Sequence, residues 1–379
     1  VIVPLGNIAL YTLAGLTGIT KRRGSIYPST LLPGRKVIPT IHPSASLRFG
    51  AVQKFKEGHR KKGIDPYVYR YWIQYDLNRV RQQCAYSDIR LLNRQLVLEP
   101  GFQQTLQYLR ECLLLPTVAV DLEATLGLNS EVTHIAIAKS PTDCLCIPFV
   151  TQRSDYWSPE QEVDIWLSLA LLLESPKVVK IFQNAAFDVS FLHRRHGIVT
   201  QPIEDTMIAT SILFPDFPAG LDFLVSVYCG GEPYYKDDGK QWNAQAFSDE
   251  LQFRLYNAKD AAVLPEIFPQ QRAELLRTRN LSTYYTQLRL VHPLTFAANT
   301  GILMDVKAIQ QEKESSAIAR AETLKEWDVA CGKLGVLVNP DSPPQVSNLF
   351  YGILRFHPYH KKGAVTCDER ALQMLVLKG

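Results

Sequence analysis

Several features that mark particular protein classes are absent from this chain of 379 residues. No two of its seven cysteines form a Cys-x-x-Cys pair, which argues against a zinc site and an iron–sulfur cluster. No run of about 18 apolar residues occurs, so we expect no membrane-spanning helix and no membrane partner. An odd number of cysteines without a secretory signal favours reduced thiols in a cytoplasmic location. The first residue is not a methionine, and we expect the chain to begin partway through a fold.

The composition favours a folded protein without naming its partner. Hydrophobic residues make up 46% of the chain and charged residues 21%, as in ordinary soluble domains. The net charge of +4 permits a polyanionic partner but is too small to identify one. The length suffices for two or three domains.

Four carboxylates in three separate segments carry most of the chemical information. Asp121 and Glu123 end the apolar run 117–120, and strand side chains alternate, so both carboxylates point to the same face. Asp188 and Asp260 lie in two further apolar segments that can converge on that edge. Converging carboxylates repel one another unless cations neutralise them, and hard oxygen ligands suit Mg²⁺ or Mn²⁺. Two such ions about 3.5–4 Å apart are a common device for phosphodiester cleavage.

Three motifs in a fixed order connect these carboxylates to a known family. In chain order they are Asp121-x-Glu123, Asn184-x-x-x-Asp188 and Tyr256-x-x-x-Asp260. This order resembles the DnaQ-like 3′–5′ exonuclease superfamily, in the tyrosine-bearing branch that includes the proofreading domain of family A (DNA polymerase I-like) DNA polymerases. The matched stretch runs from about Val118 to Phe268. One departure is Ala124, which follows the glutamate where many members carry threonine.

The resemblance implies a catalytic site with two Mg²⁺ or Mn²⁺ ions. Asp121 is the candidate to bridge both ions, and Glu123 and Asp260 would bind the ion that carries the attacking water. Asp188 would act largely through the water shell of the other ion. Tyr256 lies four residues before Asp260, so on a helix the two share a face. With an ordinary pKa of about 10, its phenol suits orienting the water better than accepting a proton.

Three residues beside these motifs are candidate contacts for the substrate. Asn184 either contacts the terminal nucleotide or braces its turn. Leu122 and Phe187 either wedge the terminal bases or pack in the interior. Asp205, which precedes Thr206 and Met207, is expected to cap a helix.

The flanking regions resemble parts of other nucleic-acid enzymes. Residues 1–55 contain Leu-Gly-Asn-x-Ala, Gly-Ile-Thr-x-x-Arg-Gly and Thr-x-His-Pro-Ser, which resemble the C-terminal half of a uracil-DNA glycosylase-like domain. There His42 would match the histidine that stabilises charge on uracil. The motif that positions the water is absent, so a truncated structural module is the alternative to an active glycosylase. Residues 276–379 contain the turn Gly301-Ile302-x-x-Asp305, a long charged segment at 308–334 and Asn339-x-x-Ser342-x-x-Gln345. This order resembles the start of a family A polymerase thumb, and no palm or fingers motif follows.

Residues 56–115 are a basic and aromatic connector, which either binds a single strand or links and packs. The clustered residues are Lys54, just before the connector, and Lys56, Arg60, Lys61, Lys62, Tyr67, Tyr69, Tyr71 and Trp72 within it. Residues 116–275 form the predicted exonuclease domain.

The expected fold class is α/β, with an RNase H-like, DnaQ-like mixed sheet flanked by helices, a partial α/β glycosylase-like piece and a helical thumb. Apolar periodicity predicts strands at 117–121, 134–138, 144–149 and 178–182. It predicts helices at 158–173, 185–196, 206–213, 221–228, 247–269 with a break near Pro265, 284–300 and 308–334. A short turn and strand are expected at 301–306.

We therefore predict a metal-dependent 3′–5′ DNA exonuclease, the proofreading part of a family A DNA polymerase that carries its palm and fingers elsewhere. Its partner would be a single-stranded or frayed 3′ end of a primer-template, in a bacterial or phage-infected cytosol or nucleoid. The alternatives are a free-standing exoribonuclease of the same fold and a non-catalytic nucleic-acid-binding module.

Overall fold

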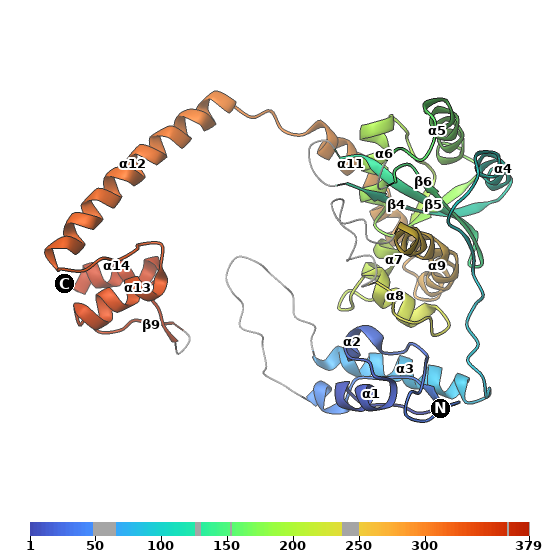
Figure 1. Cartoon of the computed structure of the whole chain (residues 1–379), viewed down its shortest axis with the longest axis horizontal. Helices are drawn as coiled ribbons and strands as arrows, with labels where there is room; N and C mark the ends of the chain where they lie inside the picture. Colours follow the sequence, from blue (N-terminus) through green and yellow to red (C-terminus); the bar gives the residue numbers. More distant parts are fainter. Residues whose placement is uncertain (48–65, 126–129, 152–153, 237–249, 362–363, 379) are drawn as a thin grey trace. The chain divides into compact units, whose positions relative to one another are not determined.

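The computed structural model describes residues 1–47, 66–125, 130–151, 154–236, 250–361 and 364–378 (Figure 1). The chain divides into two compact units, Val1–Gly301 and Ile302–Gly379. None of the helices in the described ranges is both long and apolar enough to cross a lipid bilayer. The four regions predicted from the sequence are 1–55, 56–115, 116–275 and 276–379. Their boundaries stay predictions, because the division into two compact units does not test them.

A six-stranded mixed sheet forms the centre of the first unit. Its strands, in spatial order, are β3 (Gln95–Val97), β6 (Asp143–Pro148), β5 (Val132–Ser140), β4 (Thr117–Ala124), β7 (Val179–Phe182) and β8 (Ile203–Asp205). Strand β4 pairs antiparallel with β5 and parallel with β7. The expected α/β class and mixed sheet are thus confirmed, and the strand that carries Asp121 and Glu123 lies inside the sheet.

Helices cover the sheet, and most of their bounds follow the predicted periodicity. They are α4 (Phe102–Cys112), α5 (Pro159–Leu173), α6 (Ala185–His196), α7 (Thr206–Leu213), α8 (Leu221–Tyr228), α9 (Glu250–Arg277), α10 (Leu281–Leu288) and α11 (Val291–Thr300). Helix α5 begins as its sequence indicates, because the Ser158 hydroxyl accepts from the Gln161 N–H and Pro159 stands at the first position.

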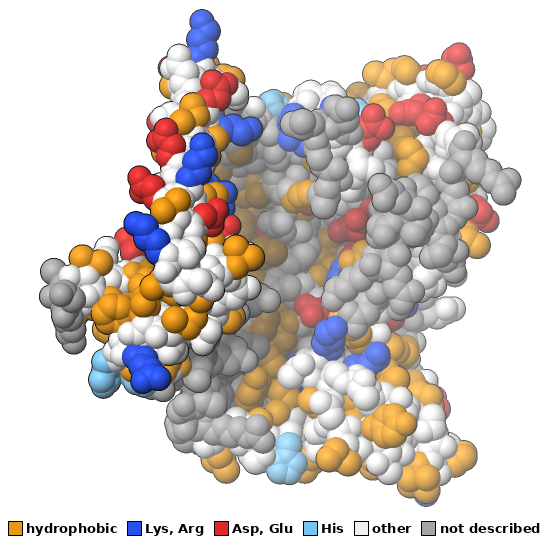
Figure 2. Space-filling view, turned by 60° about the vertical axis from the view of Figure 1, so that its left-hand side comes forward, with side chains coloured by type: hydrophobic (Ala, Val, Ile, Leu, Met, Phe, Trp, Pro, Cys, Tyr) orange, Lys and Arg blue, Asp and Glu red, His pale blue; other side chains and the backbone are white. Residues whose placement is uncertain are grey.

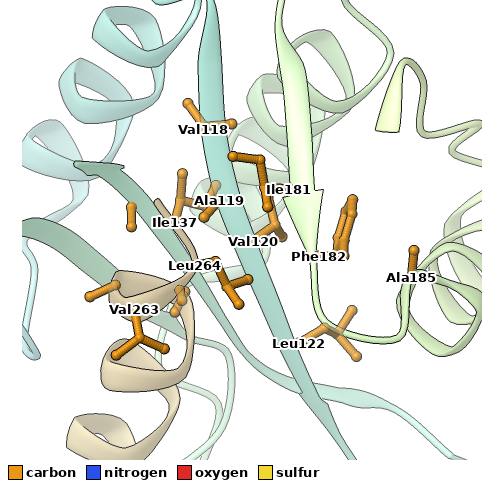
Figure 3. Packing of buried hydrophobic residues seen from close by; sticks show 14 of the residues in the cluster. Val118, Ala119, Val120, Leu122, Ile137, Ile181, Phe182, Ala185, Val263 and Leu264 are labelled. Carbon is orange, nitrogen blue, oxygen red and sulfur yellow. The ribbon is translucent and has the colours of Figure 1, made fainter. Parts of the chain in front are cut away.

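Strand β4 and helix α9 share one apolar core. Figure 3 shows Ala119 of β4 in a cluster with Ile181 of β7 and with Val263 and Leu264 of α9. These side chains are at most 3% exposed. Burial of this kind contributes about 1.5–3 kcal/mol for each large apolar side chain. The core therefore fixes the register of α9 against the strand that ends in Asp121 and Glu123.

Two helix predictions are corrected by packing. Helix α9 continues through Pro265 instead of breaking, and Leu264, Ile267 and Phe268 around the proline are buried. Their packing compensates for the backbone hydrogen bond that a proline removes. The single helix expected at 284–300 is divided into α10 and α11, because Pro293 lies in the first turn of α11 and cannot donate to a preceding turn.

Residues 301–305 also differ from the prediction, because they form no strand. They precede α12 (Val306–Lys333), where the Asp305 carboxylate accepts from the Ala308 N–H at 2.9 Å and caps the helix. A capping side chain satisfies backbone donors that the first helical turn leaves free.

The N-terminal part of the first unit packs small elements around α3. They are α1 (Asn7–Ala14), α2 (Ile19–Arg22), β1 (Tyr27–Pro28), β2 (Lys36–Val37), η1 (Pro43–Leu47), η2 (Pro66–Val68) and α3 (Tyr69–Gln83). The Arg79 guanidinium on α3 donates to the carbonyls of Ser226 and Val227 on α8, which ties this part to the sheet-bearing part.

The aromatic residues of the predicted connector divide between packing and exposure. Trp72 is 2% exposed and packs in the core, whereas Tyr67 and Tyr71 are exposed. The basic residues Lys54, Lys56, Arg60, Lys61 and Lys62 lie outside the described residues. Packing is therefore confirmed for Trp72, and single-strand binding by the others stays a prediction.

The second unit consists of α12, α13 (Pro343–Ser347), a π-helical segment η4 (Asn348–Ile353), β9 (His360–Lys361), β10 (Ala364–Val365) and α14 (Glu369–Lys378). Its small core holds Cys331, Val338, Val346 and Leu349. Figure 2 shows acidic and basic side chains alternating along α12. Hydrophobic side chains gather in the part of this unit that follows the C-terminal end of α12. A helix with so little burial depends on its own backbone and charge pairs.

Candidate active site

Three carboxylates from two distant segments meet at the end of β4. One oxygen each of Asp121, Glu123 and Asp260 lies within 4.8 Å of the others. Asp121 and Glu123 reach this point because they alternate along β4, and Asp260 reaches it from α9. The predicted convergence is therefore present for these three residues.

Asp188 lies beside this group at the start of α6. Its side chain is 4% exposed, and its Oδ1 accepts the Leu122 N–H at 3.1 Å. The group of three oxygens within 4.8 Å does not include it. The expectation that Asp188 acts at one remove from the other three stays a prediction.

The group repels itself electrostatically. Burial raises the pKa of Asp121 well above its usual range, and the charges of Asp260, Glu123 and Asp188 raise it further. Burial and the charge of Asp260 likewise raise the pKa of Glu123 to about 8. Buried like charges at this separation cost free energy unless a cation lies between them. The oxygen-only donor set and this repulsion fit a divalent ion such as Mg²⁺ or Mn²⁺.

Asn257 positions the first carboxylate. Its Nδ2 donates to Asp121 Oδ2 at 2.8 Å and to the Asp121 carbonyl at 3.2 Å, while its Oδ1 accepts from Cys146 Sγ at 3.3 Å. Hydrogen bonds of this kind orient a metal ligand. Sequence reasoning missed Asn257, although it lies three residues before Asp260 on a helix and its position there could have indicated it.

Tyr235 and Lys236 hold Asp260. The Tyr235 hydroxyl donates to Asp260 Oδ1 at 2.9 Å, and the Lys236 ammonium forms an ion pair with Asp260 Oδ2. Both residues lie in the irregular segment after α8, and no motif in the sequence signals their contact with a carboxylate more than 20 residues away.

Tyr256 stands on the same face of α9 as Asp260. Burial and the charges of Asp260, Glu123 and Asp121 raise its pKa above the ordinary value. The phenol therefore stays protonated at neutral pH and is a hydrogen-bond donor. A protonated phenol is a poor general base, and the predicted role of Tyr256 in orienting water stays a prediction.

Asn184 braces the turn that precedes α6. It adopts a left-handed conformation with φ of 68°, and its N–H donates to Asp205 Oδ1. The Ala185 N–H donates to Asp205 Oδ2 at 2.7 Å, and Oδ1 also caps α7 through the Met207 N–H at 2.7 Å. The expected cap at Asp205 is confirmed. The bracing function of Asn184 is present, and its contact with a nucleotide stays a prediction.

Leu122 and Phe187 differ in their access to a substrate. Phe187 is 40% exposed, so its ring is available to a terminal base. Leu122 is 4% exposed and packs in the core near Phe182 and Ala185 (Figure 3). Alternation along β4 puts its side chain on the face opposite Asp121. The placement of Leu122 therefore does not support the predicted wedge.

The segment that carries these carboxylates is similar to known proteins. Residues 102–275 match a family described as 3′–5′ exonuclease. These residues form a 3′–5′ exonuclease domain. A DNA polymerase of Bacillus phage SP01 is 42% identical over 55 residues, which make up 14% of this chain and 6% of the phage protein. The predicted relation to polymerase-type exonucleases is thus confirmed for this domain.

Two solved structures are similar to this chain to different degrees. The POL domain of Pol1 from M. smegmatis, solved with DNA primer-template and dNTP, is 23% identical, with a TM-score of 0.53 over 75% of this chain and 45% of that one. Escherichia coli RNase D, an exoribonuclease, is 15% identical, with a TM-score of 0.43 over 56% of this chain and 52% of that one. The chain thus spans about half of each of these two structures, and the likeness to the Pol1 domain concerns the fold alone.

Proposed function

We propose that this chain is a metal-dependent 3′–5′ DNA exonuclease that proofreads for a family A DNA polymerase. The observation that carries the proposal is the group of Asp121, Glu123 and Asp260 inside the exonuclease domain. The match to a phage DNA polymerase supports DNA as substrate and a bacterial or phage-infected cytosol as location.

The position of each residue suggests its role in metal binding, water orientation or substrate contact. Asp121, Glu123, Asp260 and, at one remove, Asp188 would hold two Mg²⁺ or Mn²⁺ ions, which supply an activated water and stabilise the leaving 3′ oxygen when bound. Asn257 keeps Asp121 oriented. Tyr256 donates a hydrogen bond to orient the water, and the exposed Phe187 ring offers a stacking surface for a terminal base.

A labelled DNA primer tests this function. We expect single-nucleotide laddering from the 3′ end with Mg²⁺ or Mn²⁺, release of nucleoside monophosphates and faster digestion of single strands and mispaired ends than of matched duplex. EDTA should abolish the ladder. An RNA strand of the same sequence separates the alternatives, because preferred digestion of RNA would favour the exoribonuclease. Binding of DNA without cleavage would favour the non-catalytic module.

The pKa of Glu123 predicts how metal binding depends on pH. A metal ligand must lose its proton, and the pKa of this carboxyl in the metal-free protein is about 8. We expect the Mn²⁺ dissociation constant to fall about tenfold per pH unit between pH 6.5 and 8 and then to level off. Calorimetric titration measures this, and Glu123→Gln should flatten the profile.

The raised pKa of Glu123 has the opposite effect on the metal-free protein, whose stability falls as pH rises. Because the folded-state pKa of Glu123 is raised above its unfolded value, folding favours the protonated form. Its stabilising contribution is present at low pH and is lost as pH rises through about 8. In EDTA the melting temperature should therefore fall between about pH 5 and 8 and level off above that range. For metal binding, an Mn²⁺ dissociation constant that stays constant between pH 6.5 and 8 would contradict the assignment of Glu123 as a ligand.

A further inference from the structure

An internal cation already contacts one of the carboxylates that would bind metal. The Lys236 ammonium pairs with Asp260 Oδ2, and the Tyr235 hydroxyl occupies Oδ1 at 2.9 Å. The Lys236 side chain is 19% exposed and the Asp260 side chain 4%. The ammonium also lies 4.4 Å from the centre of the Tyr256 ring. Both oxygens of Asp260 thus have a donor from the segment that follows α8.

We propose that Lys236 is a displaceable counter-cation, which neutralises the carboxylates in the metal-free protein and competes with the divalent ion for Asp260. This inference rests on the metal site proposed above. Three carboxylate oxygens within 4.8 Å repel one another when they are ionised, and one lysine supplies half the charge of one divalent ion. An ammonium and a metal ion cannot occupy the same side of one carboxylate oxygen.

The surrounding contacts let the side chain leave while the backbone stays. The Gly231 carbonyl accepts the Ile26 N–H at 2.8 Å, and the Tyr234 N–H donates to the Tyr27 hydroxyl at 3.1 Å. A Cβ at Gly231, where φ is +94°, would lie 2.4 Å from the Ile26 side chain, so only glycine permits this approach. The N-terminal part therefore anchors the backbone that leads to Lys236. Its long, partly exposed side chain can rotate toward solvent.

A matched pair of lysine variants tests the inference. Lys236→Met removes the competing ammonium, and Lys259→Met removes an equal charge nearby. Lys259 pairs with Glu232 at 3.7 Å and lies 5.1 Å from the centre of the Tyr235 ring. In calorimetric Mn²⁺ titrations of the full chain, we expect Lys236→Met to bind about tenfold more tightly than wild type. We expect Lys259→Met to change the affinity by less than about twofold.

Thermal unfolding gives a second readout that is independent of catalysis. In EDTA, Lys236→Met should melt below wild type, because the carboxylates lose their counter-charge, and saturating Mn²⁺ should close the gap. Lys236→Arg, which keeps the charge, should bind Mn²⁺ no more tightly than wild type. Lys236→Gln should reproduce the tighter binding with a smaller change in side-chain polarity, and so decides the sign if the methionine variant folds poorly.

The outcomes separate this inference from the proposed function. Equal or weaker Mn²⁺ binding by Lys236→Met and Lys236→Gln, with normal binding by wild type, overturns the competition and makes Lys236 a structural holder of Asp260. Absence of Mn²⁺ binding by wild type overturns the metal site and this inference together. Tighter binding by both lysine variants to the same degree also overturns it, because the effect would then be long-range charge alone.

Discussion

Asp121→Asn is expected to lower the exonuclease rate by about a thousandfold or more, since residues that act as a unit in a catalytic site are individually indispensable. Asp121 belongs to the carboxylate group and is the candidate to bridge both ions. The amide oxygen of asparagine can still accept the hydrogen bond from Asn257, so the local structure should persist. What is lost is the negative charge that a metal ion needs.

The same substitution should stabilise the metal-free protein. Burial and neighbouring charges raise the pKa of Asp121, so its ionised form opposes folding. Removing that charge should raise the free energy of unfolding in EDTA by about 1–2 kcal/mol. Urea denaturation measures this change, and a labelled primer measures the rate.

Asp143→Asn is the matched control for Asp121→Asn. Asp143 begins β6 in the same sheet, and its side chain is 45% exposed. In this variant the exonuclease rate and the free energy of unfolding should stay close to those of the wild type. A ladder of normal rate from Asp121→Asn would reject the assigned site, whereas loss of activity with loss of folding would show a structural role.

Arg23→Met is expected to destabilise the first unit by about 3–5 kcal/mol, which is the cost of leaving a buried charge without its partner. The Arg23 and Asp76 side chains are 0% and 1% exposed, and they are joined at 2.5 Å. Arg23 Nη1 also donates to Ser226 Oγ on α8 at 2.8 Å. This one guanidinium therefore joins the N-terminal part, α3 and the exonuclease domain.

The matched control for Arg23→Met is Arg90→Met. Arg90 pairs with Asp88 at 3.0 Å, and the two side chains are 59% and 57% exposed. Solvent screens such a pair, so its loss should cost less than about 1 kcal/mol. Urea denaturation of the full chain compares the two variants. Equal, small losses from both would mean that the contacts around Arg23 do not hold the N-terminal part in place.

The candidate ligands could be predicted from the sequence because each is encoded locally. Two carboxylates at alternate positions after an apolar run lie on the same face of a strand. Tyr256 and Asp260 lie on the same face of a helix because they are four residues apart. The cap at Ser158 follows from residue types in the first helical turn. In each case the physical cause acts over a few residues, and the sequence displays it directly.

Other features depended on packing between distant segments. The continuity of α9 through Pro265 is decided by the core around it, and the burial of Leu122 by the face of β4 that packs inward. Tyr235 and Lys236 carry no motif, yet the path of their segment brings both to Asp260.

The sequence by itself determined which residues are acidic, which face of each element they share and the order of the motifs. Only the tertiary structure decided that α9 lies beside β4, that Asp188 lies beside the group of three carboxylates without being part of it and that a lysine pairs with Asp260. The physical reason is that periodicity and capping are short-range, whereas the meeting of charges from separate elements depends on how their apolar faces pack together.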